Sequence, residues 1–336
     1  MLIRSAFSCE RFGSSPVVKM RALFLMVLYS VLCCASSDSS QYNIETLMEN
    51  VLVLRHNGRN IRKNVALTCG EAYQDQPVIW KKNGVSQPAL QGNQVNVLVE
   101  EMDGGNYTCH LGQGEEYLNH TVIMIQLDNS TQVILEENHP NEGHIHCSAP
   151  NYKGSFHCSW TRAKYRSNAA VLLVKAERYL EKIPCELDAD GSGIRCQDAN
   201  CPYKEEQHRI SLTIYIHSLS RLEVYTKAFY LREIVKPEKL PNLHASDGKV
   251  FSWNYPDSWE KPCTFFGLQF EVKVVKDNHS CNSEEEIMRD ITDETKYEVN
   301  VVPKKYVFCV RARDKHTSGP FGHWSQCRVN KHGMIC

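Results

Sequence analysis

The sequence lacks an excess of charge of either sign. Its 336 residues carry 38 Lys and Arg against 39 Asp and Glu, a formal net charge of -1 at pH 7. Such a balance does not steer a protein toward nucleic acid or anionic membranes, so neither is expected as a partner. The sequence also lacks a Gly-x-Ser-x-Gly elbow, a phosphate-binding glycine loop and a His-Glu-x-x-His pair. These motifs mark common enzyme classes, so we expect no enzyme and no cofactor.

Long apolar runs are scarce, and the one that stands out lies near the N-terminus. Residues 22–32 are apolar, with basic residues before them and small residues after them, which is the layout of a secretory signal peptide. We predict a signal peptide over residues 1–36, in which residues 1–19 are an upstream extension if Met20 is the start. The run is shorter than the roughly 20 apolar residues of a membrane helix. We therefore expect a secreted protein that does not insert into membranes.

Cysteine is abundant, with 15 residues in the chain. Removing the three in the predicted signal peptide leaves 15 − 3 = 12, and secretion favours disulfides among them. Zinc is the alternative, because Cys196-x4-Cys201 and the His-rich residues 144–147 have spacings that metal ligands use. Neither has the matching second pair of a structural zinc site, so disulfides are favoured and no metal is expected.

Residues 37–130 carry the pattern of an immunoglobulin-like domain. Cys69 is followed by Trp80, and Tyr107 stands two residues before Cys109. In that fold the two cysteines link the two sheets, and the tryptophan packs against the bridge. The short separation of the cysteines predicts a reduced set of strands.

Residues 131–236 predict a second domain of β-strands. Cys147 and Cys158 lie in two short segments that indicate a hairpin joined by its cysteines, with Trp160 just after it. Residues 209–216 alternate between apolar and other side chains, as in a strand that is buried on one face. The later cysteines of this domain lie in polar, glycine-rich sequence, where a disulfide would hold a loop.

Residues 237–330 predict a third domain, followed by a tail over residues 331–336. A linker stiffened by prolines leads into it. The expected strands include residues 249–253, 267–275 and 306–313.

Two arginines and two aromatic residues of the third domain predict a stacked ladder. Arg311 and Arg313 are two residues apart in a predicted strand, so their side chains share a face. Phe321 and Trp324 follow on what should be the neighbouring strand, where they can interleave with the guanidinium groups. Each stacking contact contributes about 0.5–2 kcal/mol. We expect this ladder to be structural.

The order of the three domains resembles the type I cytokine receptor family, and the motifs are most similar to its interleukin-12 beta-subunit branch. The similarity begins at about residue 45 and rests on the segments 107–110, 151–160, 196–202, 229–237, 253–259 and 310–314. It implies an all-β fold of three tandem β-sandwiches, one immunoglobulin-like (C2-type) and two fibronectin type III-like. One departure is that residues 321–325 read Phe-Gly-His-Trp-Ser in place of Trp-Ser-x-Trp-Ser.

The resemblance further implies half of a heterodimeric cytokine. Its partner would be a four-helix-bundle alpha subunit of the interleukin-12 alpha or interleukin-23 alpha type, and the pair would bind a cell-surface type I cytokine receptor. Cys201 matches the position of the interchain disulfide. Asp314 matches the acid that receives an arginine from the alpha subunit, and Tyr152, Glu205 and Phe265 match other positions of that pocket.

Disulfide pairs and glycosylation sites complete the expectations for the chain. We predict the pairs Cys69–Cys109, Cys147–Cys158, Cys185–Cys196, Cys309–Cys327 and Cys263–Cys281. With Cys201 given to an alpha subunit, an odd number of cysteines remains, and Cys336 is the candidate for the leftover thiol. Either Cys201 or Cys336 could then link a homodimer. Sequons predict N-glycosylation at Asn106, Asn119, Asn129 and Asn278.

Two other binding functions remain open at the level of sequence. One is a soluble or anchored cytokine receptor alpha chain, which the lack of an apolar segment after residue 324 disfavours. The other is an immunoglobulin-type adhesion protein, which would not need the paired-cysteine domain or an unpaired Cys201.

Overall fold

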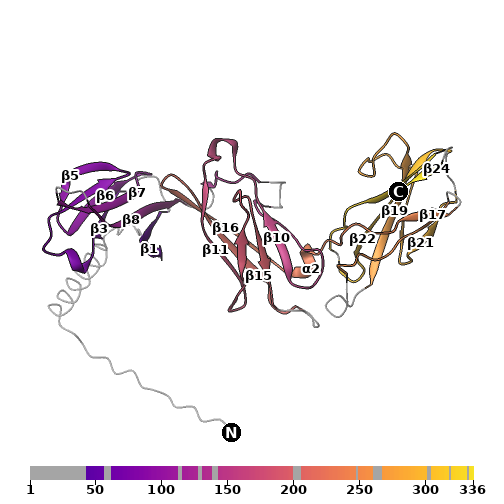
Figure 1. Ribbon diagram of the computed structural model, residues 1–336, viewed down its shortest axis with the longest axis horizontal. Helices are drawn as coiled ribbons and strands as arrows, with labels where there is room; N and C mark the ends of the chain where they lie inside the picture. Colours follow the sequence, from indigo (N-terminus) through magenta and orange to yellow (C-terminus); the bar gives the residue numbers. More distant parts are fainter. Residues whose placement is uncertain are drawn as a thin grey trace, which may run out of the picture. The chain divides into compact units, whose positions relative to one another are not determined.

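Strands follow one another along the described part of the chain (Figure 1). The computed structural model describes residues 43–56, 62–112, 116–127, 131–137, 143–199, 206–246, 249–259, 267–300, 304–317, 319–330 and 333–336. The predicted all-β architecture is confirmed, with strands arranged in several sheets. The predicted signal peptide lies outside the described residues, and so do Cys201, Glu205, Cys263, Phe265 and Asn129.

Two sheets build the first predicted domain. Its strands are β1 (Asn43–Met48), β2 (Val51–His56), β3 (Arg62–Thr68), β4 (Val78–Lys82), β5 (Val85–Gln91), β6 (Gln94–Glu100), β7 (Gly105–Leu111) and β8 (Glu116–Leu127), with a 3₁₀ turn, η1 (Glu71–Tyr73), after β3. Strands β5, β4, β7 and β8 lie in one sheet, extended by β2 and β1, and β3 pairs with β6 in the other. Alternate residues of β6 are buried, which is the period of a strand with one face on a core.

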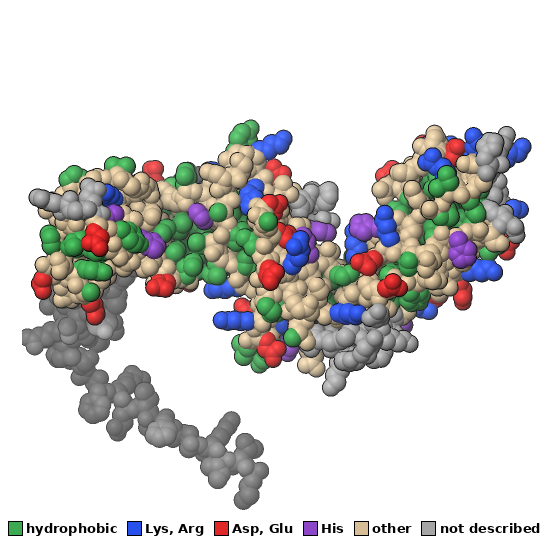
Figure 2. All heavy atoms as spheres, in the orientation of Figure 1, with side chains coloured by type: hydrophobic (Ala, Val, Ile, Leu, Met, Phe, Trp, Pro, Cys, Tyr) green, Lys and Arg blue, Asp and Glu red, His purple; other side chains and the backbone are tan. Residues whose placement is uncertain are grey.

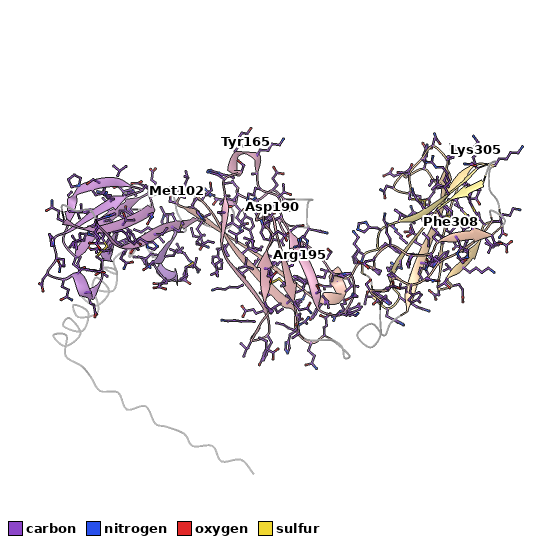
Figure 3. The ribbon with its side chains drawn as sticks, in the orientation of Figure 1. Met102, Tyr165, Asp190, Arg195, Lys305 and Phe308 are labelled. Atoms are coloured by element: carbon purple, nitrogen blue, oxygen red, sulfur yellow. A yellow bond between two sulfur atoms is a disulfide. The ribbon has the colours of Figure 1, made fainter. Side chains whose placement is uncertain are left out.

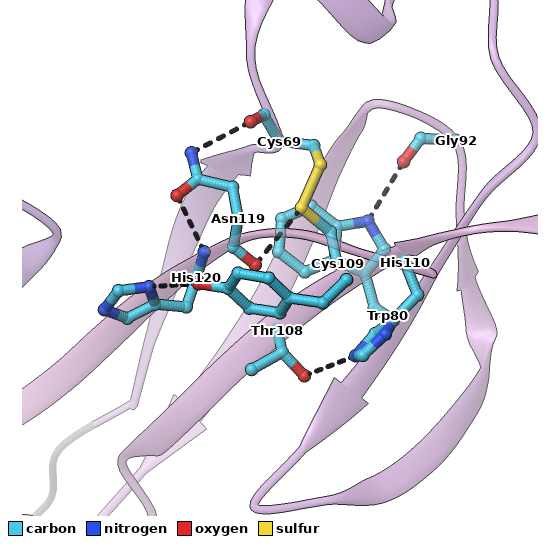
Figure 4. Close-up of a disulfide and its surroundings, with 9 residues drawn as sticks. Cys69, Trp80, Gly92, Thr108, Cys109, His110, Asn119 and His120 are labelled. Carbon is cyan, nitrogen blue, oxygen red and sulfur yellow. Dashed lines mark hydrogen bonds between the residues drawn. A yellow bond between two sulfur atoms is a disulfide. The ribbon is translucent and has the colours of Figure 1, made fainter. Parts of the chain in front are cut away.

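A disulfide between Cys69 and Cys109 joins these two sheets, as predicted (Figure 4). Trp80 on β4 lies directly opposite Cys109 in the ladder and is buried. Its indole N–H donates to the carbonyl of Gly92 at 3.0 Å, so burial leaves the one polar atom of the side chain satisfied.

The second predicted domain also has two sheets. Its elements are β9 (His146–Ser148), β10 (Ser155–Ser159), η4 (Lys164–Arg166), β11 (Ala170–Arg178), β12 (Glu181–Lys182), β13 (Cys185–Leu187), β14 (Gly193–Gln197), β15 (Ile210–Ser218), β16 (Arg221–Phe229) and the one-turn helix α2 (Leu231–Ile234). One sheet has the order β12-β11-β15-β16 and the other β13-β14-β10-β9. Cys147 lies opposite Cys158, and Cys185 opposite Cys196, and both pairs form the predicted disulfides.

The sheet of the first predicted domain continues into the second, because β16 pairs in parallel with β8. Beside this junction, the buried carboxylate of Glu223 accepts hydrogen bonds from the backbone N–H groups of Val133 and Ile134. It also accepts from the Tyr225 hydroxyl and the Arg221 guanidinium. These donors offset the cost of burying the charge, so the polar groups hold the connecting chain in place.

Two sheets make the third predicted domain as well. Its strands are β17 (His244–Ser246), β18 (Val250–Ser252), β19 (Leu268–Lys276), β20 (Met288–Thr292), β21 (Lys296–Glu298), β22 (Tyr306–Asp314), β23 (Ser325–Asn330) and β24 (Gly333–Ile335). The strand orders are β17-β18-β21 and β20-β19-β22-β23-β24. The side chain of Phe308 (Figure 3) stacks on Phe251 of the facing sheet, with ring centroids 3.8 Å apart. Trp253 meets Phe270 edge to face, so four aromatic side chains fill this core.

The disulfides predicted in the third domain are wrong. The structure bonds Cys281 to Cys309 and Cys327 to Cys336. The predicted pairs Cys309–Cys327 and Cys263–Cys281 are therefore not formed. In the ladder Cys327 lies opposite Phe308, one residue before Cys309, so Cys309 and Cys327 point to opposite faces of the sheet. Cys309 instead packs beside Cys281, and the prediction that Cys336 keeps a free thiol is also wrong.

The new pairs change the cysteine count. Five disulfides use ten cysteines, and subtracting them from the twelve outside the predicted signal peptide leaves 12 − 10 = 2. These two are Cys201 and Cys263, which lie outside the described residues. If Cys201 bonds to an alpha subunit, as predicted, the odd cysteine expected from the sequence is therefore Cys263 and not Cys336.

The distribution of charge on the surface and the length of the helices relate to the expectation that neither nucleic acid nor a membrane is a partner. Acidic and basic side chains are interspersed on the face shown in Figure 2. In the described part of the chain, no helix has the length and apolar character needed to cross a membrane.

Peptide mapping under non-reducing conditions tests the revised pairing. We expect one linked peptide pair that contains Cys281 and Cys309 and another that contains Cys327 and Cys336, because the strand register keeps Cys309 and Cys327 on opposite faces of the sheet. Replacing Cys281 and Cys309 together by Ala should destabilise the third domain by about 3 kcal/mol, the usual value for a closed loop of this order of length. A peptide that joins Cys309 to Cys327 would contradict the register.

Candidate functional site

The loop between β9 and β10 meets the end of β22 at a buried pair, Tyr152 and Asp314. The Tyr152 hydroxyl donates a hydrogen bond to Oδ2 of Asp314 at 2.8 Å. Oδ1 of Asp314 accepts from the backbone N–H groups of His316 at 2.7 Å and Thr317 at 3.2 Å. Asp314 is 1% exposed and Tyr152 4%. One carboxylate thus closes the turn after β22 and also binds the second predicted domain to the third.

The phenol of Tyr152 is held in its neutral form. Burial, followed by the charge of Asp314 and the hydrogen bond to it, raises the pKa of Tyr152 far above its ordinary value. The hydroxyl therefore keeps its proton and stays a hydrogen-bond donor to Asp314 over the whole physiological range. Charge-assisted hydrogen bonds of this kind are stronger than neutral ones, and stronger still where water is excluded.

Further contacts surround this pair. The ring of Trp259 meets Tyr152 edge to face, with centroids 5.9 Å apart. Nδ2 of Asn151 donates to the carbonyl of Ser258 at 2.9 Å. These side chains come from one loop of the second predicted domain and from the segment after β18, so the contact has an apolar and a polar part. Trp259 lay in a motif noted in the sequence but was not singled out there.

A buried ion cluster, missed from the sequence, lies at the same end of the second predicted domain. The guanidinium of Arg178 donates to Asp198 at 2.8 Å and to Glu206 at 3.0 Å, and all three residues are buried. Glu206 also accepts from the backbone N–H groups of Leu231 and Arg232 in α2. The cluster therefore fixes the helix that leads into the linker. No sequence period marks such a group, because each charged residue alone has the appearance of a solvated one.

The predicted ladder of arginine and aromatic side chains is present. The guanidinium carbon of Arg311 lies 4.7 Å from the ring centroid of Phe321 and 4.2 Å from that of Trp324. That of Arg313 lies 4.6 Å from the Phe321 centroid. Buried Glu271, on the neighbouring strand β19, accepts a hydrogen bond from Arg311 and compensates its charge. This carboxylate was not anticipated from the sequence.

The segment with Phe321 and Trp324 is bonded to the linker. Ser325 Oγ donates to the carbonyl of Leu240 at 2.9 Å. A Cβ atom added to Gly322 would stand 2.1 Å from the carbonyl oxygen of Pro237, so the linker approaches the backbone there too closely for any side chain. The ladder thus supports the chain that joins the second and third predicted domains.

The sequons differ in their surroundings. Asn106 and Asn278 are exposed. The side chain of Asn119 is engaged, since its amide donates to the carbonyl of Cys69 at 3.0 Å and its oxygen accepts from the N–H of His120 at 2.8 Å (Figure 4). Asn119 therefore braces the Cys69 end of the first disulfide.

Two of the three cysteines that suggested a zinc site are bonded to other cysteines, and the third, Cys201, lies outside the described residues. Cys147 is bonded to Cys158 and Cys196 to Cys185. Among the described residues, no group of three or more His, Cys, Asp or Glu side chains is placed to hold a metal ion.

Comparison with known proteins identifies similar chains. The family described as "Cytokine interleukin-12p40 C-terminus" matches residues 142–218. Interleukin-12 subunit beta of Felis catus is 30% identical over 290 residues, which cover 78% of this chain and 85% of the relative. The human protein of that name is 29% identical over 289 residues, with the same shares of both chains covered. That of Sigmodon hispidus is 31% identical over 239 residues, 64% of this chain and 72% of the relative.

Removing Trp324 tests the ladder. We expect Trp324→Ala to destabilise the third predicted domain by about 3 kcal/mol, the low end for a large aromatic side chain, because Trp324 is half-buried. Thermal unfolding and the yield of secreted protein measure the effect. Tyr165→Ala is the matched control, since Tyr165 is 95% exposed and its loss should leave both quantities unchanged. A normal melting temperature for Trp324→Ala would mean that the ladder does not contribute to stability.

Glycopeptide mass spectrometry of the secreted protein tests the role of Asn119. We expect glycans on Asn106 and Asn278 and none on Asn119, because a glycan replaces a hydrogen on the same Nδ2 that donates to Cys69. Full occupancy of Asn119 would show that this brace is not needed in the folded protein.

Proposed function

The chain belongs to the interleukin-12 subunit beta family and is a cytokine subunit of that kind, and we propose that it is the receptor-like half of a secreted heterodimer. It acts by binding and not by catalysis. The partner is a four-helix-bundle alpha subunit of the interleukin-12 alpha or interleukin-23 alpha type. The heterodimer engages a cell-surface type I cytokine receptor and regulates T-cell and natural killer cell responses.

The observation that carries this proposal is the buried carboxylate of Asp314 at the contact of the second and third predicted domains. Its oxygens accept three hydrogen bonds within the chain, and Oδ2 accepts one of them. A carboxylate has about four acceptor positions, so Oδ2 retains one for an arginine of the alpha subunit, which would have to displace the side chains that cover Asp314 in the free chain. An ion pair formed there would be partly desolvated, which is typical of an interface hot spot. Tyr152 orients that oxygen, and Glu205 and Phe265 are proposed to line the same pocket.

The interchain disulfide is assigned to Cys201. Ten cysteines are bonded within the described residues, so Cys201 and Cys263 are the two that remain outside the predicted signal peptide. Giving Cys201 to the alpha subunit leaves Cys263 as a single thiol. Without an alpha subunit, Cys201 could instead link two copies of this chain.

Co-expression with candidate alpha subunits tests the covalent bond. The secreted product of the unaltered chain should run as a heterodimer on non-reducing electrophoresis. Cys201→Ser should abolish that band but leave the subunits associated, and Cys263→Ser should leave the band in place. Loss of the band in Cys263→Ser, together with its retention in Cys201→Ser, would show that Cys263 forms the interchain bond and would contradict the assignment to Cys201.

Comparing two variants of the buried pair tests the carboxylate separately. Asp314→Ala and Tyr152→Phe both remove the hydrogen bond between the two side chains, but Asp314→Ala also removes the acceptor for the arginine. Association with the alpha subunit should weaken by about 2–5 kcal/mol in Asp314→Ala and by far less in Tyr152→Phe. Co-precipitation under reducing conditions gives the comparison. Equal losses would mean that Asp314 supports the fold and does not contact the partner.

A further inference from the structure

A cavity of about 800 Å³ lies between the linker and the ladder of Arg311, Arg313, Phe321 and Trp324. Lys236, Lys239 and Leu240 line it from the linker. The ring of Trp324 and the side chain of Arg311 line it from the ladder. Both walls are held, since Ser325 is bonded to the linker and Arg311 is stacked and paired with Glu271. The cavity is therefore preformed.

Its charge is of one sign. No Asp or Glu side chain lines it, whereas Lys236, Lys239, Arg311 and His323 do. Lys236 is half-buried, and neither it nor Lys239 has a hydrogen bond or ion pair from its ammonium group within the described residues. An ammonium group that is half withdrawn from water and lacks a counter-charge favours an anion beside it.

Nearby acidic side chains do not neutralise this charge. Glu271 is committed to Arg311. Glu286 lies 2.8 Å from Arg289, and Glu285 lies 3.8 Å from Lys276. Glu238 stands between the two linker lysines in sequence but does not line the cavity. A negative ligand would therefore enter without displacing an existing ion pair.

The remaining lining suits an extended peptide. The amides of Asn242, Asn282 and Gln326 can bond to a backbone, and the half-buried side chains of Leu243 and Trp324 offer apolar surface to alternate side chains. Cys336 also lines the cavity and follows directly after β24, the outermost strand of its sheet. An extended chain at such an edge finds backbone groups that have no ladder partner among the described strands.

We propose that this cavity is a second binding site, which takes an extended acidic segment of a partner protein. Carboxylates of the segment pair with Lys236 and Lys239, and apolar side chains between them face Leu243 and Trp324. The site is separate from the Asp314 pocket and does not depend on the proposed alpha subunit. It gives the chain a way to bind a further protein through its third predicted domain.

A labelled peptide of alternating glutamate and valine tests the proposal against the full-length secreted chain, by fluorescence anisotropy. We expect saturable binding at one site that weakens with added salt, because exposed ion pairs are screened. The double variant Lys236→Gln/Lys239→Gln should bind about tenfold more weakly or worse, since it loses two ion pairs. Lys182→Gln/Lys305→Gln is the matched control, as it removes the same charge from two exposed positions away from the cavity.

The outcomes distinguish a specific acidic-peptide site from attraction by net charge and from a site for other anions. Binding that is retained by the control and lost by the cavity variant, with unchanged melting temperatures, supports the site. Equal loss in both double variants would show attraction by net charge alone. Equal binding of a peptide with glutamine in place of glutamate would remove the role of the carboxylates. Tighter competition by inorganic sulfate or dextran sulfate than by the unlabelled peptide would overturn the choice of a peptide ligand.

Discussion

The hydrogen-bonded carboxylate of Asp314 connects the parts of the structure on which the proposed binding depends. It ends β22 by accepting from two backbone N–H groups of the following turn, and it also takes the hydroxyl of Tyr152 from the second predicted domain. Because the group is buried, each of these bonds forms where water cannot replace it. A charge that needs several donors in fixed places orders the loops that supply them. The loops that carry a binding surface can therefore be held in fixed positions.

Polar groups hold the linker from both ends by the same principle. On one side Glu206, paired with Arg178, accepts from the start of α2. On the other side Ser325 donates to Leu240, while Gly322 lets the backbone approach Pro237. These contacts do not add apolar burial, but they define where the chain lies, because a buried donor or acceptor tolerates little displacement before its bond is lost. The proposed acidic-peptide site depends on this fixed position of the linker, because the linker and the ladder form its two walls.

Much of the fold could be predicted from local pattern. Alternation over residues 209–216 identified β15, whose isoleucine and leucine side chains are fully buried. Cys69, Trp80 and Cys109 identified the first sandwich because their spacing reflects a disulfide and an aromatic contact between sheets. The pairs Cys147–Cys158 and Cys185–Cys196 followed from short loops with few other partners. The third-domain cysteines failed because pairing across strands depends on register, and a shift of one residue turns a side chain to the other face.

The sequence by itself determined the strand periodicity, the three blocks of cysteine and tryptophan, the arginines that stack, and the positions that resemble a cytokine subunit. These features can be recognised from residue type and spacing alone, because alternate side chains of a strand point to the same face. The tertiary structure alone decided that Cys309 reaches Cys281, that Glu271 and Glu206 are buried and paired, and that Asp314 bonds to Tyr152. Residues far apart in the chain meet in each case, and sequence spacing carries no measure of the register and loop paths that bring them together.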